Sequence, residues 1–253
     1  MPYLDIYRPL NGHRRPTALS GRNILPHNNT LERIDRFSEV LETPAGKEKI
    51  FKLVQYFMRL VLIFKSVQPK PSPVDIWLSK FVVQISMFRN INELGDWLKP
   101  GLELIDKTED SKTRFDIKYI KLWSQFWNSI FDDVYCVLKM QASPSKKWAD
   151  DQANRFWLLN IWLSLYIEHV NLVQQQKEYD DLVKASTEKP CDDERANRLA
   201  KKRVFSLLNV LKLLCDMVFV SVEVFHLHVH KLFQVVPGLA AASLGTYKLL
   251  AKQ

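Results

Sequence analysis

The amino-acid sequence predicts an all-α protein, a membrane-associated bundle of long amphipathic helices that ends in a short apolar helix rich in small residues. Apolar residues make up 47% of the 253 residues and aromatic residues 11%, which is enough for a sizeable core. Only 7 glycines occur, and apolar residues recur at helical rather than strand spacing. We expect a polar, basic, flexible N-terminal tail over residues 1–35 and a single helical domain over residues 36–253.

Helix boundaries in the first half follow from capping residues. After a short helical pattern over Leu31–Leu41, Thr43 is placed to cap a helix with Pro44 in its first turn. This helix is expected to run to about Ser66.

The next helix begins with a clear capping signal. Ser72 can cap the helix, Pro73 can start it, and Asp75 stands where a reciprocal capping bond forms. Aromatic and aliphatic residues then repeat at helical spacing. We expect the segment Lys99-Pro100-Gly101 to end this helix.

The sequence after residue 112 predicts three further long helices. They are expected over Thr113–Met140, from about Trp148 to Lys184, and from Glu194 to about Lys231. Pro237-Gly238 is expected to interrupt the pattern before a short apolar tail helix.

The helix over Thr43–Phe64 is apolar around most of its circumference. Its narrow polar edge consists of Glu48, Lys52, Gln55 and Arg59. Two interpretations of the apolar arc stay open: burial in an ordinary helical bundle, or insertion into the interface of a membrane with anionic lipids. For insertion, the membrane-inserting face is Ile50, Leu53, Val54, Phe57, Leu60, Val61 and Phe64, and the lipid-headgroup contacts are Lys47, Lys49, Lys52 and Arg59.

No segment predicts a secure membrane span. Phe156–Ile167 is too short, and charged residues interrupt the helix after Val204. Leu232–Tyr247 is the longest run without Asp, Glu, Lys or Arg, and is the best candidate for partial insertion. Its small residues suit close helix packing in a membrane or in a soluble bundle; they are Gly238, Ala241, Ala242 and Gly245.

Charge and reactive residues narrow the function classes. The net charge of +8 favours an anionic partner, either nucleic acid or a membrane surface. The three cysteines are far apart, which argues against a disulfide framework. His226 and His230 would share a helix face, but no third ligand is placed beside them. Asp132-Asp133 is expected on a solvated face. We therefore expect no enzyme, no cofactor and no metal site.

Four stretches resemble the peroxin eleven family of peroxisomal membrane proteins. They occur in the family's order and cover about Phe37 to Ala251, and they read FSEVLETPAGKEKIFKLVQYFMRLV, SMFRNINELGDWLKP, KKWADDQANRFWLLNIWLSLYIEHV and HKLFQVVPGLAAASLGTYKLLA. The matching positions include Gly46, Arg59, Arg89, Arg155 and Trp157.

The resemblance implies a protein of the peroxisomal membrane that elongates the membrane by inserting its amphipathic helix. In this family such proteins promote peroxisome division and proliferation and self-associate. They work with a dynamin-like GTPase and its membrane adaptor.

Two other functions stay open. A membrane channel for small metabolites is the alternative, with Gln125, Asn128, Asp132 and Asp216 as candidate lining residues. A soluble basic bundle that binds nucleic acid rests on net charge alone. Because no nucleic-acid module is recognisable, we expect no nucleic-acid partner.

Overall fold

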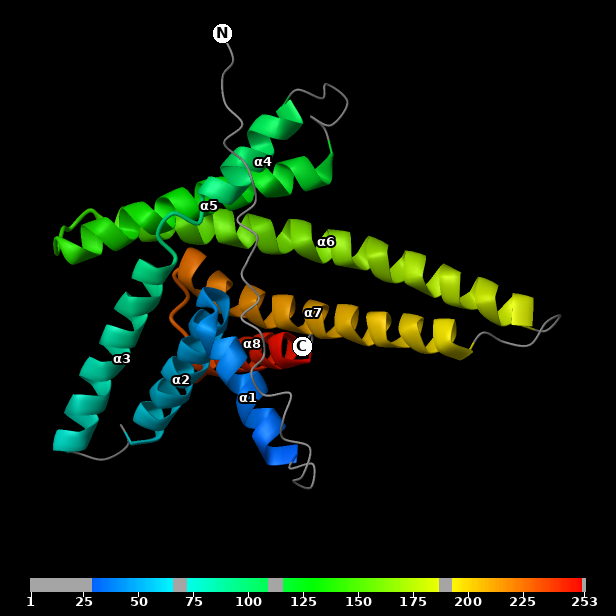
Figure 1. Cartoon of the computed structure of the whole chain (residues 1–253). Coiled ribbons are helices and arrows are strands. Elements are labelled where there is room, and N and C mark those ends of the chain that lie inside the picture. Colours follow the sequence, from blue (N-terminus) through cyan, green and yellow to red (C-terminus); the bar gives the residue numbers. More distant parts are fainter. Residues whose placement is uncertain (1–28, 66–71, 109–115, 187–192, 252–253) are drawn as a thin grey trace, which may run out of the picture.

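The computed structural model describes residues 29–65, 72–108, 116–186 and 193–251, and within these ranges the chain is helical and contains no strand. Figure 1 shows the arrangement. The predicted tail therefore lies largely outside the described residues. The helices are α1 (Asn29–Glu42), α2 (Pro44–Lys65), α3 (Pro73–Asn92), α4 (Leu98–Thr108), α5 (Ile117–Met140), α6 (Lys146–Ser186), α7 (Asp193–Val224) and α8 (Leu232–Leu250).

The helices form two connected groups. Helices α5, α6 and α7 pack in sequence, and the α6–α7 hairpin extends away from the rest of the molecule (Figure 1). Helix α2 packs against α3 on one side and α8 on the other, and α8 also packs against α7. Helix α8 thereby connects the two groups. The space between α2 and α5 lies inside the molecule.

Both predicted N-terminal caps are confirmed. The Thr43 hydroxyl accepts a hydrogen bond from the Gly46 amide at 3.0 Å. At α3, the Ser72 hydroxyl accepts from the Asp75 amide at 3.3 Å, and the Asp75 carboxylate accepts from the Ser72 amide at 2.9 Å. A Cβ atom at Gly46 would collide with the Val40 carbonyl, so the glycine permits the tight junction of α1 and α2.

The prediction that Lys99-Pro100-Gly101 ends a helix is wrong. Helix α3 ends earlier, at Asn92, and Gly95 adopts a φ of 89° in the turn that follows. Helix α4 then begins at Leu98 and contains these three residues in its first turn. Proline is tolerated there because the first amides of a helix have no intrahelical partner.

Helix α7 ends at Val224, seven residues before the predicted end. His226 adopts a φ of 49°, and the connection from Phe225 to His230 is exposed. His226 and His230 therefore do not share a helix face. Within the described residues, no group of three or more His, Cys, Asp or Glu side chains is placed to hold a metal ion.

Pro237 does not interrupt the C-terminal helix. Helix α8 begins at Leu232 and continues through the proline at the loss of one backbone hydrogen bond. Gly238 follows it and faces Tyr56 of α2. A Cβ atom at this position would lie 2.6 Å from the ring of Tyr56, so only glycine allows the two helices to pack at this distance.

The helices that could span a membrane differ from the sequence prediction. Among the described residues, the segments long and apolar enough are Lys146–Leu182 in α6 and Glu194–Val224 in α7, whereas Leu232–Tyr247 is not one of them. The charges that argued against α7 include Lys212 and Asp216, which form an ion pair at 2.9 Å and so reduce each other's cost in an apolar medium. The 41 residues of α6 extend about 60 Å, twice the hydrocarbon core of a bilayer.

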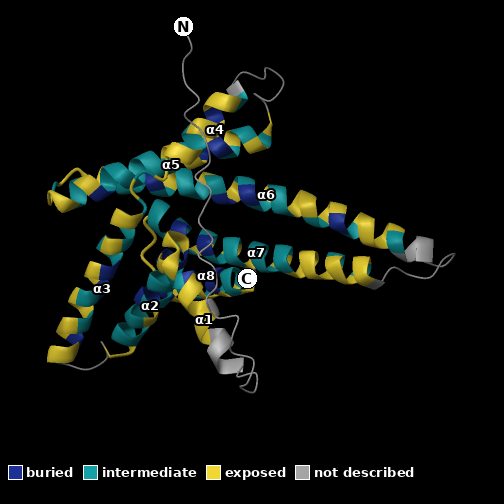
Figure 2. Cartoon of the chain, in the orientation of Figure 1, coloured by how far each residue is buried: buried dark blue, intermediate teal, exposed yellow. Residues whose placement is uncertain are grey.

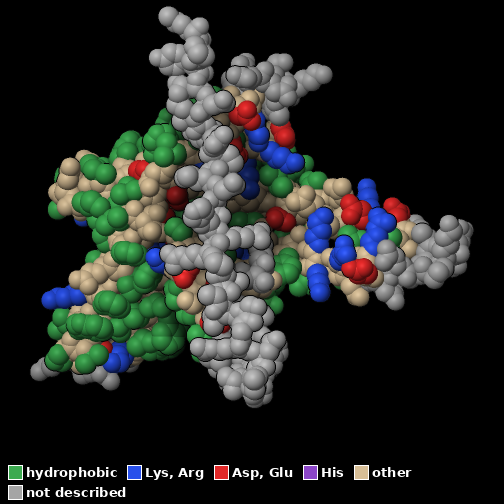
Figure 3. Space-filling model, in the orientation of Figure 1, with side chains coloured by type: hydrophobic (Ala, Val, Ile, Leu, Met, Phe, Trp, Pro, Cys, Tyr) green, Lys and Arg blue, Asp and Glu red, His purple; other side chains and the backbone are tan. Residues whose placement is uncertain are grey.

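The distribution of side chains is partly inverted relative to a soluble protein. Figure 2 shows that few residues of α3 and α4 are buried, although both helices are rich in apolar residues. Figure 3 shows hydrophobic side chains covering the face over α2 and α3, while charged side chains gather toward the far end of the α6–α7 hairpin. Several polar residues are buried instead, among them Glu48, Gln55, Ser124 and Asp216.

Candidate functional site: a charged cavity between apolar helices

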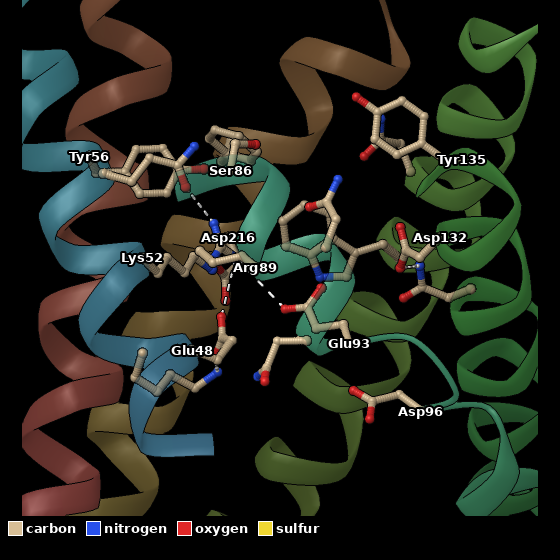
Figure 4. A pocket seen from close by; sticks show the side chains of 18 of the residues that line it. Glu48, Lys52, Tyr56, Ser86, Arg89, Glu93, Asp96, Asp132, Tyr135 and Asp216 are labelled. Atoms are coloured by element: carbon tan, nitrogen blue, oxygen red, sulfur yellow. Dashed lines mark hydrogen bonds and ion pairs between the residues drawn. The ribbon is translucent and has the colours of Figure 1, made fainter. Parts of the chain in front are cut away.

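A cavity of about 830 Å³ lies between α2, α3, α5, α6 and α7. Figure 4 shows that side chains from these helices point into it from opposite sides. Most of them are charged or polar. The residues with a charged or aromatic group at the cavity include Glu48, Lys49, Lys52, Tyr56, Arg59, Arg89, Glu93, Asp96, Asp132, Tyr135, Lys139, Asp150, Trp157, Lys212, Asp216 and Glu223.

Arg89 on α3 is the central cation of the cavity. Its Nη1 donates to Gln55 Oε1 at 2.7 Å, and its Nη2 donates to Glu48 Oε1 at 3.2 Å (Figure 4). Glu93 Oε1 lies 3.9 Å from Nη2. The Nε of Arg89 is buried, and no hydrogen-bond partner reaches it from the described residues. Arg89 therefore fixes the polar edge of α2 against α3 and retains one unused donor.

A second ion-pair group connects α2 to α7. Lys52 Nζ lies 3.6 Å from Asp216 Oδ1, and Lys212 Nζ donates to Asp216 Oδ2 at 2.9 Å. Lys52 Nζ also lies 5.8 Å from the centre of the Trp157 ring on α6. Opposite charges therefore link these three helices beside the ring contacts of Phe219 with Tyr56 and Trp157.

The wall formed by α5 and α6 is acidic. Asn128 donates to Asp132 Oδ2 at 2.8 Å. In the described part of the chain, no ion pair joins Asp96, Asp132 or Asp150 to a cation. Burial raises the pKa of Asp132 to about 7, and the negative charges of Glu93 and Asp150 act in the same direction.

The two glutamates beside Arg89 respond in opposite directions. Burial raises the pKa of Glu93, and Arg89 offsets this only in part. Burial also opposes ionisation of Glu48, but the adjacent Lys49, which forms an ion pair with it, and Arg89 together hold the pKa of Glu48 below its ordinary value. Negative charge on the α2 side of the cavity is therefore held in ion pairs, whereas among the described residues of the α5–α6 side Lys139 lines the cavity without forming an ion pair with Asp132 or Asp150.

The predicted membrane-inserting face of α2 lies opposite the cavity. Phe57 is 59% exposed and Phe64 is 66% exposed, whereas Gln55 on the polar edge is 2% exposed. The other predicted residues are half-buried, since α3 and α8 cover parts of the arc; they are Ile50, Leu53, Val54, Leu60 and Val61. The thin polar edge noted in the sequence is therefore the buried edge of the helix.

The four predicted headgroup residues separate into two pairs. Lys47 is exposed, and Lys49 is half-buried beside Glu48. Lys52 points into the cavity toward Asp216, and Arg59 lies 5.3 Å from the centre of the Tyr56 ring at the cavity wall. Lys47 and Lys49 stay predicted headgroup contacts, although Lys49 also lines the cavity, whereas Lys52 and Arg59 face the cavity.

The small residues of α8 are used for packing within the chain. Gly238 faces Tyr56 of α2, and Gly245 faces Lys49 and Lys212. Ala241 and Ala242 are each 1% exposed. The close approach predicted for these residues occurs between α8 and its neighbours α2 and α7.

Three of the four candidate channel-lining residues meet at the cavity. Asn128, Asp132 and Asp216 line it, whereas Gln125 is exposed and lines a smaller hollow beside α4. Asp132 is half-buried, so its expected place on a solvated face is wrong. A sequence signal was available: Asn128 and Asp132 are four residues apart on the helix and share a face.

The fold and the site together define the class of protein. Apolar outer faces, a charged interior and two helices long enough to cross a bilayer are typical of α-helical membrane-associated proteins. The chain matches the model of the family "Peroxisomal biogenesis factor 11 (PEX11)" over residues 34–250, and it belongs to that family. The family is peroxisomal and membrane-associated and serves peroxisome biogenesis and proliferation. Comparison with curated proteins and with solved structures finds no match.

Proposed function

We propose that this protein resides in the peroxisomal membrane and elongates it by inserting the apolar face of α2 into one leaflet, which promotes peroxisome division and proliferation. One observation carries the proposal. On α2 the apolar arc carries two exposed aromatic residues, Phe57 at 59% and Phe64 at 66%, whereas Glu48 on the polar edge is 9% exposed. An exposed apolar face next to a membrane is stabilised by contact with acyl chains.

The energies favour insertion. Each large apolar side chain moved from water contributes about 1.5–3 kcal/mol as an upper range. Phe57 and Phe64 are the most exposed on α2, and exposed apolar residues of α3 such as Trp77 and Val83 would add to the same surface. A basic residue at an anionic leaflet, such as Lys47, contributes about 1 kcal/mol more. Area added to one leaflet alone favours curvature.

Self-association and cooperation with a dynamin-like GTPase and its membrane adaptor belong to the same proposal. Their support is the family membership, together with the extent of exposed apolar surface on α3 and α4. The functional argument rests on the family as a whole and not on any single relative. We propose anionic membrane lipids as the first partner.

The test replaces apolar residues of α2 with acidic ones in the full-length chain. The variant Leu53→Glu, Phe57→Glu is expressed as a tagged protein, and peroxisome length and number are measured in cells. We expect elongated or more numerous peroxisomes with the unchanged protein and not with the variant. The purified variant is expected to lose flotation with anionic liposomes.

The matched control is Leu53→Ile, Phe57→Leu, which keeps the apolar face. It should elongate peroxisomes as the unchanged chain does. Helical content and thermal melting in detergent are measured for both variants to separate insertion from folding. Elongation that persists in the acidic variant at equal expression would contradict the proposal.

A conducting pore for small metabolites is the second candidate. The observation that favours it is the polar cavity of about 830 Å³ within an apolar exterior. Recording from planar bilayers with the purified full chain tests it. A conductance that changes its ion selectivity in Asp132→Asn would support a pore through this cavity, and no conductance at protein densities that fully occupy the bilayer would rule it out.

A further inference from the structure

We infer that the charged cavity between α2, α3, α5, α6 and α7 binds a zwitterionic phospho-ammonium group, such as the headgroup of a phosphatidylcholine or phosphatidylethanolamine, with the phosphate at Arg89 and the ammonium at the acidic wall. This inference goes beyond membrane remodelling and does not depend on insertion of α2. The volume of the cavity, about 830 Å³, falls in the range of ligand pockets, about 300–1,000 Å³.

The cationic side of the cavity has donors suited to a phosphate. Arg89 uses its two Nη atoms for Gln55, Glu48 and Glu93, while its buried Nε receives no bond from the described residues. A buried donor without an acceptor is costly, and a phosphate oxygen would satisfy it. Lys52 and Lys49 line the same side and add positive charge.

The opposite side carries more carboxylates than cations: Lys139 lines it, with its ammonium 5.1 Å from the centre of the Tyr135 ring. Asp132 and Asp150 line the cavity, and among the described ion pairs neither has a partner. Burial raises the pKa of Asp132, neighbouring acids raise it further, and the hydrogen bond from Asn128 offsets these effects only in part. An ammonium placed between the two carboxylates would supply the missing charge. Tyr135 and Trp157 also line the cavity, and each ring already has a lysine ammonium near it, Lys139 at 5.1 Å and Lys52 at 5.8 Å from the ring centres, so both rings are cation-binding faces.

A metal ion is a poorer occupant than an organic cation. The described residues contain no group of three or more His, Cys, Asp or Glu side chains placed for a metal. A simple anion would leave Asp132 and Asp150 without an ion pair among the described residues, and a simple cation would leave Arg89 Nε unsatisfied. A ligand that carries both charges satisfies both walls at once.

The position of the cavity relative to the apolar surface suits a lipid. Ser86, Arg89 and Asn90 of α3 line the cavity, whereas Phe88 and Ile91 of the same turns are exposed. Helix α2 alternates in the same way, with Tyr56 inside and Phe57 outside. A lipid with its headgroup in the cavity could therefore lay its acyl chains along these outer faces.

The test measures binding to the purified full chain in detergent by native mass spectrometry. The probes are short-chain phosphatidylcholine, short-chain phosphatidylglycerol, which lacks the ammonium, and glycerophosphocholine, which lacks the acyl chains. We expect phosphatidylcholine to bind at least tenfold more tightly than phosphatidylglycerol. Tighter binding of phosphatidylcholine than of glycerophosphocholine identifies a membrane lipid as the source of the group, whereas equal binding identifies a soluble metabolite with the same headgroup chemistry.

The acidic wall offers a matched pair of variants. Asp132→Asn with Asp150→Asn removes two charges from the cavity, whereas Asp133→Asn with Asp151→Asn removes two charges from the adjacent positions, which do not line it. The first variant should weaken phosphatidylcholine binding at least tenfold, and the second should leave it within about twofold. Unselective binding of both lipids, equal effects of the two variants, or no binding would each overturn the inference.

This outcome is distinguishable from failure of the remodelling proposal. The variant Leu53→Glu, Phe57→Glu is expected to lose liposome flotation and yet retain binding of short-chain phosphatidylcholine, because its substitutions lie outside the cavity. Helical content and thermal melting of all variants show whether a loss of binding reflects a loss of fold.

Discussion

Helices α2 and α3 are both amphipathic and adjacent, yet the structure holds them by different means. Helix α2 is packed on two sides, and its buried residues include Glu48, Gln55 and Tyr56. Helix α3 packs on α2 and only lightly on α5, and its outer residues are largely exposed. Helix α2 is therefore held by ion pairs and by close packing against two helices. Helix α3 is held mainly by α2, and its apolar residues face outward.

The largest effect is expected at Arg89, the residue that joins the two helices. Arg89→Met removes the cation that binds Gln55 and Glu48, and leaves Glu48 with Lys49 alone. Breaking a buried ion pair by removing one partner costs about 3–5 kcal/mol. Thermal melting in detergent should show a loss of about that size.

Two comparisons sharpen this prediction. Arg155→Met removes an exposed arginine on α6 and should leave the melting temperature nearly unchanged. Glu48→Gln combined with Arg89→Met removes the uncompensated charge and should recover part of the loss. If Arg89→Met melts like the unchanged protein, the ion-pair network does not hold α3 to α2.

The next effect is expected where α2 meets α8. Gly238→Leu places a side chain where a Cβ atom alone would lie 2.6 Å from the Tyr56 ring. Overpacking of this kind costs about 1–3 kcal/mol, which should lower the melting temperature measured in detergent. Ser243→Leu, at an exposed position of the same helix, is the control. Equal melting of the two variants would mean that α8 does not lock α2.

These two joints differ in how far the sequence could reveal them. The spacing of Gly238, Ala241, Ala242 and Gly245 predicts a close helix contact, and the structure has one, because side-chain size alone fixes how near two backbones can approach. The partner helix was not predictable, since neither spacing nor composition encodes which distant helix arrives there. Tyr56 lies 182 positions before Gly238 in the chain.

The polar edge of α2 shows the limit of helical-wheel reasoning. Its residues were identified correctly as Glu48, Lys52, Gln55 and Arg59. A wheel separates two faces and does not say which one is buried, and the ordinary assumption places the charged face outside. That assumption fails for Lys52 because Asp216, which pairs with it, lies 164 positions later in the sequence. The helix end expected at Pro100 was misplaced because proline also suits the first turn of a helix, and the interruption expected at Pro237 does not occur although this proline lies inside α8.

A smaller effect is expected from pH, through Asp132 on the wall that faces α2 and α3. Its folded-state pKa is about 7 and lies above its ordinary value of 3.8. Between these values the folded chain binds more protons than the unfolded chain, so the contribution to stability is present at low pH and is lost as the pH rises through 7. Glu93, Asp150 and Asp133 are the acids that act on this carboxyl.

Thermal melting in detergent as a function of pH measures this effect. We expect Asp132 to reduce stability by about 1 kcal/mol between pH 5 and pH 7, less than the limit of about 1.4 kcal/mol per pKa unit because the side chain is only half-buried. In Asp132→Asn this part of the pH dependence should be absent, while Asp133→Asn should retain it. Identical pH profiles for the unchanged chain and Asp132→Asn would exclude an uncompensated carboxyl at this position.

The smallest effect on stability is expected on the outer face of α3. Ile76 and Val83 are exposed there and lie about two turns apart on one side of the helix. Replacing both with glutamine removes no buried contact. The free energy of unfolding, followed by thermal melting in detergent, should therefore change by no more than about 0.5 kcal/mol. Partition into anionic vesicles should weaken by about 1.5–3 kcal/mol per residue if this face touches acyl chains.

The pair Val82→Gln, Ile85→Gln on the buried side of the same helix is the contrast. It should lower stability strongly, since buried amides there would lack partners. If the outer pair destabilises as much as the inner pair, the outward face of α3 is a packing surface for another copy of the chain or another protein, and α3 is held from both sides as α2 is.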